Sequence, residues 1–203
     1  MNTITEMIPF IVPETPSATE AIISMRLREA VRIFCRETES WRIKVEIDRV
    51  DEQADYDVTI LYDAYIKRIL SIKNRTSTTQ SFDSITGMNL NQYRLNDEYT
   101  GFSFLSGYEP KNDLSTGIEI EMVLMPETNC EELSGNLLDR YYEGIVSKAK
   151  ALLMRTPQTP YFNPDLSQFY EREYIVCVAN AIRENQIKFR NSNLQIKQLG
   201  NIL

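Results

Sequence analysis

The chain has 203 residues and a formal net charge of −7, from 22 basic and 29 acidic residues. This acidic balance argues against a dedicated nucleic-acid binder, which usually has a basic face, but it does not exclude a protein that DNA merely passes through. The sequence contains no histidine, the commonest general base and metal ligand, so it predicts no enzyme, no catalytic or metal site and no cofactor.

Three prolines mark the first segment of the chain. Pro9, Pro13 and Pro16 exclude a continuous helix, because proline lacks the amide hydrogen that a helix interior needs. The residue before each proline is also biased toward extended backbone. Residues 1–16 are therefore predicted to form an extended strap.

A long amphipathic helix is predicted over residues 17–38. Ser17 and Glu20 fit a capping box, in which two side chains bond the free amides at a helix start. Apolar residues then recur at helical spacing on one face, which indicates a helix packed against a core. The stripe consists of Ile23, Leu27, Ala30, Val31 and Phe34.

From Trp41 the apolar period changes to two, which is typical of a half-buried strand. Ile43, Val45 and Ile47 alternate with charged residues there. Turn-forming residues predict exposed loops at 74–81 and 107–113. Further strands are predicted at residues 56–61, 66–72, 93–95, 101–105 and 118–124, so the middle of the chain, residues 42–130, is predicted to be an antiparallel β-rich insertion.

An acidic cluster lies in the first turn of this insertion. It does not match a calcium-binding EF-hand loop, because the sixth and twelfth positions counted from Asp51 are Tyr56 and Tyr62, where the loop needs Gly and Glu. We interpret the cluster as a solvated hairpin loop. Its members are Asp48, Asp51, Glu52, Asp55 and Asp57.

Cysteine usage indicates a protein that folds in a reducing cytoplasm, and the lengths of the apolar runs bear on contact with a membrane. Cys35, Cys130 and Cys177 are far apart, odd in number and in no metal-binding spacing, so they are predicted to be reduced, packed thiols. No apolar run approaches the ~20 residues that cross a bilayer. We therefore expect no contact with a membrane.

Helical periodicity returns in the last third. A helix is predicted over residues 137–155, ended by Pro157 and Pro160, and its stripe consists of Leu138, Tyr141, Tyr142, Ile145, Ala149, Leu152 and Leu153. Asn163 before Pro164 is typical of an N-cap, so a last helix is predicted over 164–189. Its inward face is predicted to carry Leu166, Tyr170, Tyr174, Cys177 and Ala181.

Residues 190–203 break the helical pattern. They are mostly polar with scattered apolar residues, too few to pack alone, so they are either a frayed tail or an arm that becomes ordered on a partner.

Tyr161 and Phe162 lie between the two C-terminal helices beside prolines, a position from which they could contact a neighbouring surface.

Two segments, one near each end, carry a family resemblance. The first is the proline-bracketed lead Ile8–Pro16 with its apolar helix, which closes on Phe34, Cys35 and then Trp41. The second runs from Leu137 through Met154 to Pro157, Pro160, Tyr161, Phe162, Asn163 and Pro164. Together they cover about half of the chain and resemble the head-to-tail adaptors of tailed bacteriophages.

This resemblance implies an α+β fold with a helical bundle from residues 1–41 and 131–189, the β-rich insertion, and an extended arm at 190–203. It implies a structural virion protein in the phage neck, assembled in the host cytoplasm as a ring of about twelve copies. Such a ring bridges the portal protein and a tail tube or nozzle protein, and duplex DNA passes through it without specific binding.

The resemblance transfers no functional residue onto the β-rich insertion, so the contact residues are our own prediction. The arm would dock on the portal through Leu194, Ile196, Leu199, Ile202 and Leu203. Contacts with the tail or between subunits would come from the loops and the interhelical turn, through Arg75, Tyr108, Tyr161 and Phe162. Two alternatives remain: a non-viral α+β protein-binding module, and a histidine-free enzyme that uses carboxylates.

Overall fold

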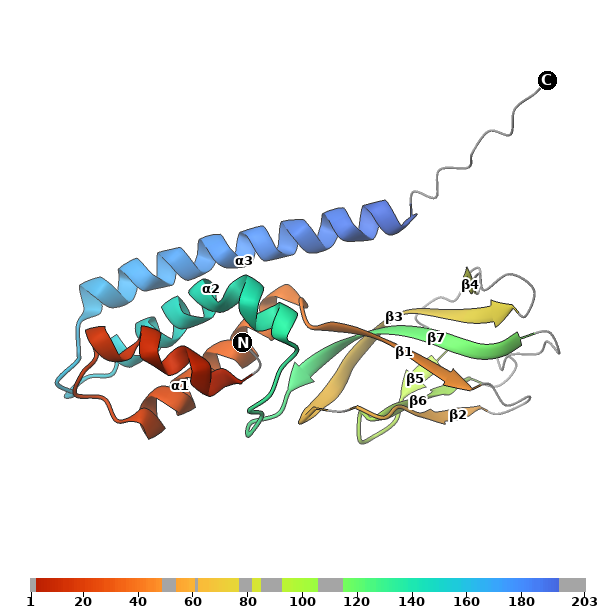
Figure 1. Cartoon of the computed structure of the whole chain (residues 1–203), viewed down its shortest axis with the longest axis horizontal. Helices are drawn as coiled ribbons and strands as arrows, with labels where there is room; N and C mark the ends of the chain where they lie inside the picture. Colours follow the sequence, from red (N-terminus) through yellow and green to blue (C-terminus); the bar gives the residue numbers. More distant parts are fainter. Residues whose placement is uncertain are drawn as a thin grey trace, which may run out of the picture.

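A computed structural model describes residues 3–48, 54–60, 62–76, 82–84, 93–105 and 115–193 (Figure 1). Helices from both ends of the chain lie together and form a helical lobe, residues 3–39 and 135–193. The strands between them, residues 42–126, form a β lobe beside it. The fold is therefore α+β, as predicted, while the assignment of domains by residue range stays a prediction.

The N-terminal segment is not an extended strap, and that prediction is wrong. It forms two 3₁₀ helices, η1 (Ile4–Phe10) and η2 (Val12–Glu14), because the fixed backbone angle of proline also fits a 3₁₀ turn. The Ile4 amide donates to the Glu131 carbonyl at 3.0 Å, which fixes the segment to the chain that precedes α2. Its inward side chains are fully buried at Ile4, Met7 and Ile11.

Helix α1 (Glu20–Thr38) begins later than predicted. Its N-cap is Thr19, which makes no side-chain cap bond, so the capping box at Ser17 is wrong. A capping box occurs instead at the start of η1, between Thr3 and Glu6. The predicted apolar stripe of α1 is confirmed, since all five of its side chains are inaccessible to solvent.

Helices α2 (Gly135–Met154) and α3 (Pro164–Asn193) confirm the two predicted C-terminal helices. The Asn163 side chain accepts the Leu166 amide at 3.1 Å, which confirms the predicted N-cap. Because α3 continues to Asn193, the first four residues of the predicted arm are helical. Residues 194–203 lie outside the described part of the chain.

Helix α3 packs antiparallel on α2, and its C-terminal part extends beyond the point where α2 begins (Figure 1). The predicted inward face of α3 is partly wrong, because Leu166 is 41 % exposed. The helices approach so closely that a Cβ built on Gly144 of α2 would lie 2.2 Å from Cys177 Sγ. Small and polar residues therefore occupy the inward face of α3, where Ser167, Ala181 and Asn185 are buried together with Tyr174.

All described strands pair antiparallel in two sheets. The larger sheet has the order β1–β7–β3–β4, with β1 Arg42–Asp48, β7 Ser115–Pro126, β3 Ala64–Thr76 and β4 Phe82–Ser84. The smaller sheet has the order β2–β6–β5, with β2 Asp55–Asp57, β6 Gly101–Phe104 and β5 Tyr93–Leu95.

The predicted strands correspond to these elements with shifted ends. β3 and β7 are longer than predicted, so residues 74–76 belong to a strand and not to an exposed loop. β2 is only three residues long, and the short β4 was not predicted. The rest of the loop at 74–81 and the loop at 107–113 lie outside the described residues, as do Asp51 and Glu52 of the acidic cluster.

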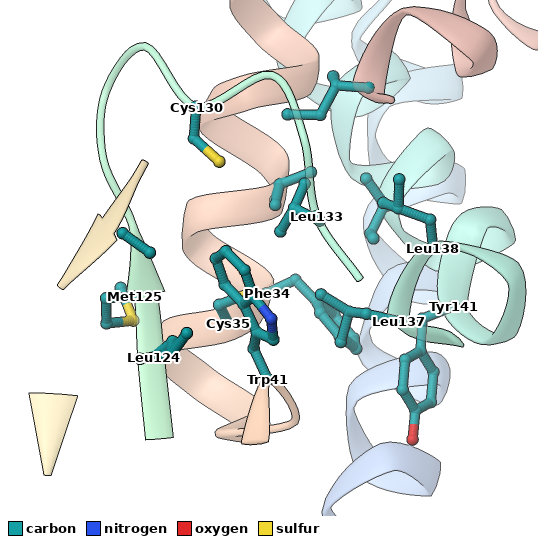
Figure 2. Packing of buried hydrophobic residues seen from close by; sticks show 14 of the residues in the cluster. Phe34, Cys35, Trp41, Leu124, Met125, Cys130, Leu133, Leu137, Leu138 and Tyr141 are labelled. Atoms are coloured by element: carbon teal, nitrogen blue, oxygen red, sulfur yellow. The ribbon is translucent and has the colours of Figure 1, made fainter. Parts of the chain in front are cut away.

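The junction of the two lobes is built by the residues that carry the family resemblance. Phe34, Cys35 and Trp41 are each no more than 1 % exposed and lie in one apolar cluster (Figure 2). Leu124 and Met125 of β7 join them from the sheet, and the Leu124 amide donates to the Trp41 carbonyl at 2.9 Å. One continuous core therefore runs through both lobes.

Candidate functional site

Two similar polar clusters hold α3 against the rest of the helical lobe. In each cluster α2 supplies a buried lysine, α3 supplies a tyrosine, and the N-terminal part of the chain supplies a glutamate. The first cluster is Lys148, Tyr174 and Glu37, and the second is Lys150, Tyr170 and Glu14. They join segments that are far apart in sequence.

The first cluster lies between α1, α2 and α3. Lys148 is 7 % exposed, and its Nζ lies 2.5 Å from Glu171 Oε1 and 4.7 Å from the centre of the Tyr174 ring. The Tyr174 hydroxyl donates to Glu37 of α1 at 2.7 Å. The carboxylate and the ring face compensate the cost of burying a lysine, which is high without partners.

The second cluster ties η2 to the same two helices. Lys150 Nζ lies 2.6 Å from Glu14 Oε1 and 5.0 Å from the centre of the Tyr170 ring. The Tyr170 hydroxyl donates to the other oxygen of the Glu14 carboxylate. One carboxylate therefore accepts from both C-terminal helices and fixes η2 against them.

The protonation states of these groups favour a structural role. Burial, and then the hydrogen bond to Glu37, raises the pKa of Tyr174 above its ordinary value. Burial, and then the hydrogen bond to Glu14, raises the pKa of Tyr170 to about 12. Burial alone would raise the pKa of Glu14, but the bonds from Lys150 and Tyr170 outweigh it and leave the pKa lowered. Near neutral pH the two hydroxyls therefore remain protonated donors.

A third contact joins α3 to the end of α1. The Asn185 side-chain amide is buried and donates to the Thr38 carbonyl at 3.0 Å and to Ser40 Oγ at 2.9 Å. Nearby, the Glu184 carboxylate accepts the Tyr141 hydroxyl at 2.8 Å and pairs with Arg140 at 2.8 Å. Directional polar bonds thus hold the inward side of α3 in addition to the apolar contacts of Tyr174 and Ala181 with the core.

The outward side of α3 carries large apolar side chains. Their exposed fractions lie between 36 and 59 %, and they are Leu166, Phe169, Ile175, Val176, Ile182 and Ile187. An extended set of exposed apolar residues on one element is typical of an interaction surface. The sequence interpretation missed this surface, although the exposed residues recur at helical spacing.

The structure places only part of the predicted contact residues. Phe162 is 47 % exposed in the turn before α3, whereas Tyr161 is half-buried against the core of its own chain. Arg75 lies on β3, and its side chain is outside the described part. Tyr108 and the five arm residues, Leu194, Ile196, Leu199, Ile202 and Leu203, also lie outside it.

A second exposed apolar group lies near the N-terminal segment. Phe10, Val12, Ile22 and Met25 are between 36 and 50 % exposed on η1, η2 and α1. A depression of about 600 Å³ opens to solvent beside them, with a mixed lining that includes Thr5, Pro9, Glu20 and Arg28. Its open shape and mixed lining resemble a contact surface more than an enclosed substrate site.

The described residues bring together few groups for chemistry. Burial raises the pKa of the Cys35 thiol, and that of Cys130 to about 11, so both remain protonated near neutral pH. Within the described ranges, no group of three or more Asp, Glu, Cys or His side chains could hold a metal ion. None of the described helices has the length and apolar character to cross a membrane.

Comparison with known proteins identifies no relative. No protein-family model matches the chain, and no curated protein matches it either. Function therefore has to be argued from the sequence pattern and from geometry.

Proposed function

We propose that the protein is a structural virion protein of a tailed bacteriophage, a ring-forming adaptor between the portal and the tail tube or nozzle. The observation that carries this proposal is the junction in Figure 2. Phe34, Cys35 and Trp41, which carry the sequence resemblance, lie together where the helical lobe meets the β lobe. The subunit is then a bundle of N- and C-terminal helices from which the β insertion projects.

The surfaces of the helical lobe support a role in assembly. A closed ring needs two different faces on each subunit, one for each neighbour. The described part has exposed large apolar side chains in two regions, on the outward side of α3 and on η1, η2 and the start of α1. In a ring, each of these regions could contact one of the two neighbouring subunits.

The proposed channel lets DNA slide without binding it. The net charge of −7 favours a channel wall that is acidic or neutral, and such a wall does not attract phosphate. The purified protein is then expected to bind duplex DNA weakly at physiological salt, with fluorescence anisotropy of a labelled duplex as the measurement. Strong binding under those conditions would contradict this channel.

The competing class is a non-viral α+β protein-binding module. The exposed apolar side of α3 favours it as well, because such a face can take up one partner protein without any ring. The two classes differ in assembly. An adaptor associates with portal rings as many copies, and a binding module does not.

The deciding experiment is electron microscopy of the full-length protein, alone and mixed with purified portal rings of the same phage. We expect extra density on one side of the portal with about twelve subunits, and co-sedimentation with the rings. Phe162→Ser removes a half-exposed aromatic ring at a predicted contact and should weaken binding to the portal or between subunits. Tyr99→Ser in the β lobe is the matched control, because it also removes a half-exposed aromatic ring. Absence of any binding to the portal would reject the adaptor and leave the binding module.

The C-terminal arm provides a second test. Removing residues 194–203 takes away Leu194, Ile196, Leu199, Ile202 and Leu203 but leaves α3 complete. We expect an unchanged melting temperature and weaker co-sedimentation with portal rings, because isolated apolar residues in a polar segment cannot stabilise the subunit by themselves. Unchanged docking would refute the arm as a portal clamp, and a much lower melting temperature would show that it belongs to the core.

A further inference from the structure

Six residues of α3 lie on one outward line at the spacing of a coiled-coil seam. They follow each other at intervals of four, three, four, three and four residues, which keeps them on one face of a helix. All six are exposed, and we call them the α3 seam: Phe169, Glu173, Val176, Asn180, Arg183 and Ile187. Glu173, Asn180 and Arg183 make no side-chain hydrogen bond or ion pair with any described residue.

We propose that two copies of this chain pair through the α3 seam as an antiparallel helix pair. The order of side chains in the seam is complementary to its own reverse. When the helices run in opposite directions about a point beside Val178, the outermost apolar residues face each other and each charge faces its opposite, while Val176 and Asn180 meet near the centre. The facing pairs are Phe169 with Ile187, Glu173 with Arg183, and Val176 with Asn180, each made twice.

The charges decide the direction of the pair. A parallel pair in register would place Glu173 against Glu173 and Arg183 against Arg183, and facing like charges are destabilising. The antiparallel pair replaces both repulsions by two ion pairs. It also places Phe169 of one copy, 52 % exposed, against Ile187 of the other, 47 % exposed, so that both apolar side chains leave water.

The position of α3 leaves this seam accessible. The polar clusters of Lys148 and Lys150 and the bonds of Asn185 hold the opposite side of α3, so pairing needs no rearrangement of the subunit. The helix also extends past the end of α2, which gives a second copy room along its length (Figure 1).

The size of the contact sets its strength. The seam is about 27 Å long from its first to its last residue. A single helix from each copy buries less than the ~1,600 Å² of a standard interface, so the pair is weak and forms at micromolar concentrations. A two-fold pair closes on itself and builds no ring. It is a state of the free subunit and does not depend on the proposed adaptor function.

Charge reversal tests this pair. Sedimentation velocity of the full-length protein, from about 1 to about 300 µM and without portal, should show a monomer–dimer equilibrium. Glu173→Arg and Arg183→Glu should each weaken dimerisation roughly tenfold or more, and the double variant should return to within about threefold of the parent. Arg94→Glu is the matched control, because Arg94 is exposed on β5 of the β lobe, away from the seam, and its reversal should leave dimerisation unchanged.

Three results would overturn the proposal: a parent protein that stays monomeric over the whole range, a double variant that does not recover, or an Arg94→Glu variant as weak as Arg183→Glu. Circular dichroism and the melting temperature of each variant confirm that the fold is retained. Because portal rings are absent, failure here leaves the adaptor proposal standing, and failure to bind portal leaves the pair standing.

Discussion

Helices α1 and α3 are both long and both belong to the helical lobe, yet they bury opposite kinds of side chains. α1 turns Ile23, Leu27 and Phe34 inward, and none of them is accessible to solvent. α3 turns Ser167 and Asn185 inward and leaves large residues such as Phe169 and Val176 more than half exposed. One helix is held by apolar area, and the other mainly by directional bonds and close approach.

This difference teaches what each helix is built to do. Burial of apolar area is non-directional, so the inward stripe of α1 serves the core, and the exposed large apolar residues of this helix are Ile22 and Met25 near its start. Hydrogen bonds and buried ion pairs hold α3 at a defined place while using few large apolar side chains. Its outward face carries exposed apolar residues such as Phe169 and Val176 beside charged ones such as Glu173, a composition that suits contact with another molecule.

The largest expected difference in stability between the two helices appears when a charge replaces one aromatic residue on each. Phe34→Asp puts an unpaired carboxylate into the junction core and should lower the free energy of unfolding by about 4 kcal/mol or more. Phe169→Asp, the matched control on the outward face of α3, should cost less than about 0.5 kcal/mol at low protein concentration. Urea unfolding followed by circular dichroism measures both, and equal effects would break the comparison.

Close approach can be tested at Gly144. In a helix interior, Gly→Ala normally stabilises by about 1 kcal/mol. Here the added Cβ would lie 2.2 Å from Cys177 Sγ, so α3 has to shift, and we expect a loss of about 2 kcal/mol instead. The sign of the change in the free energy of unfolding is the readout. A stabilised variant would show that α2 and α3 are not in tight contact at this point.

The same contrast explains which parts of the fold were predictable from sequence. The stripe of α1 and the alternation of Ile43, Val45 and Ile47 are local patterns of apolar residues, and each identified its element correctly. The Asn163 cap is local as well, and it was found. The N-terminal segment failed, because proline excludes an α-helix interior but not a 3₁₀ turn.

The candidate surface was harder to predict, because it depends on contacts between distant segments. Leu166 was assigned inward since it is apolar, whereas its neighbour Ser167 is the buried residue and donates to the Ala151 carbonyl. Lys148 and Lys150 have the character of surface residues, and only the folded chain shows that Tyr174 and Tyr170 cover them. A weak inward stripe on a helix with many apolar residues was the available signal.

Removal of one directional bond should have a moderate effect. Asn185→Ala leaves the Thr38 carbonyl and Ser40 hydroxyl without their donor and should cost about 1–2 kcal/mol of unfolding free energy. Asn180→Ala on the outward face is the matched control and should change stability by less than about 0.5 kcal/mol. If both substitutions are neutral, the end of α1 does not hold α3.

The smallest expected effect is a pH dependence that the Glu14 cluster contributes. Burial of Glu14 would raise its pKa, but the bonds from Lys150 and Tyr170 outweigh burial and leave it below the ordinary value of 4.5. A carboxyl group with a lowered pKa in the folded state stabilises the fold above its unfolded pKa. That contribution is lost as the pH falls from about 4.5 through the lower folded pKa.

Glu14→Gln should therefore lose less stability than the parent when the pH is lowered from about 5 to about 3. The Glu14 side chain is 38 % exposed, so solvent screening should limit the difference in unfolding free energy between the two proteins to roughly a few tenths of a kcal/mol. Glu39 of the α1 end is the comparison, since burial would raise its pKa but Lys67 and Arg68 of β3 lower it. Glu39→Gln should remove a similar pH dependence without loosening α3.

Urea unfolding at a series of pH values gives the slope of stability against pH for each variant, and 1 M salt should reduce both slopes because ion pairs near the surface are screened. Parallel profiles for the parent and Glu14→Gln would show that this carboxylate does not hold η2 to the C-terminal helices.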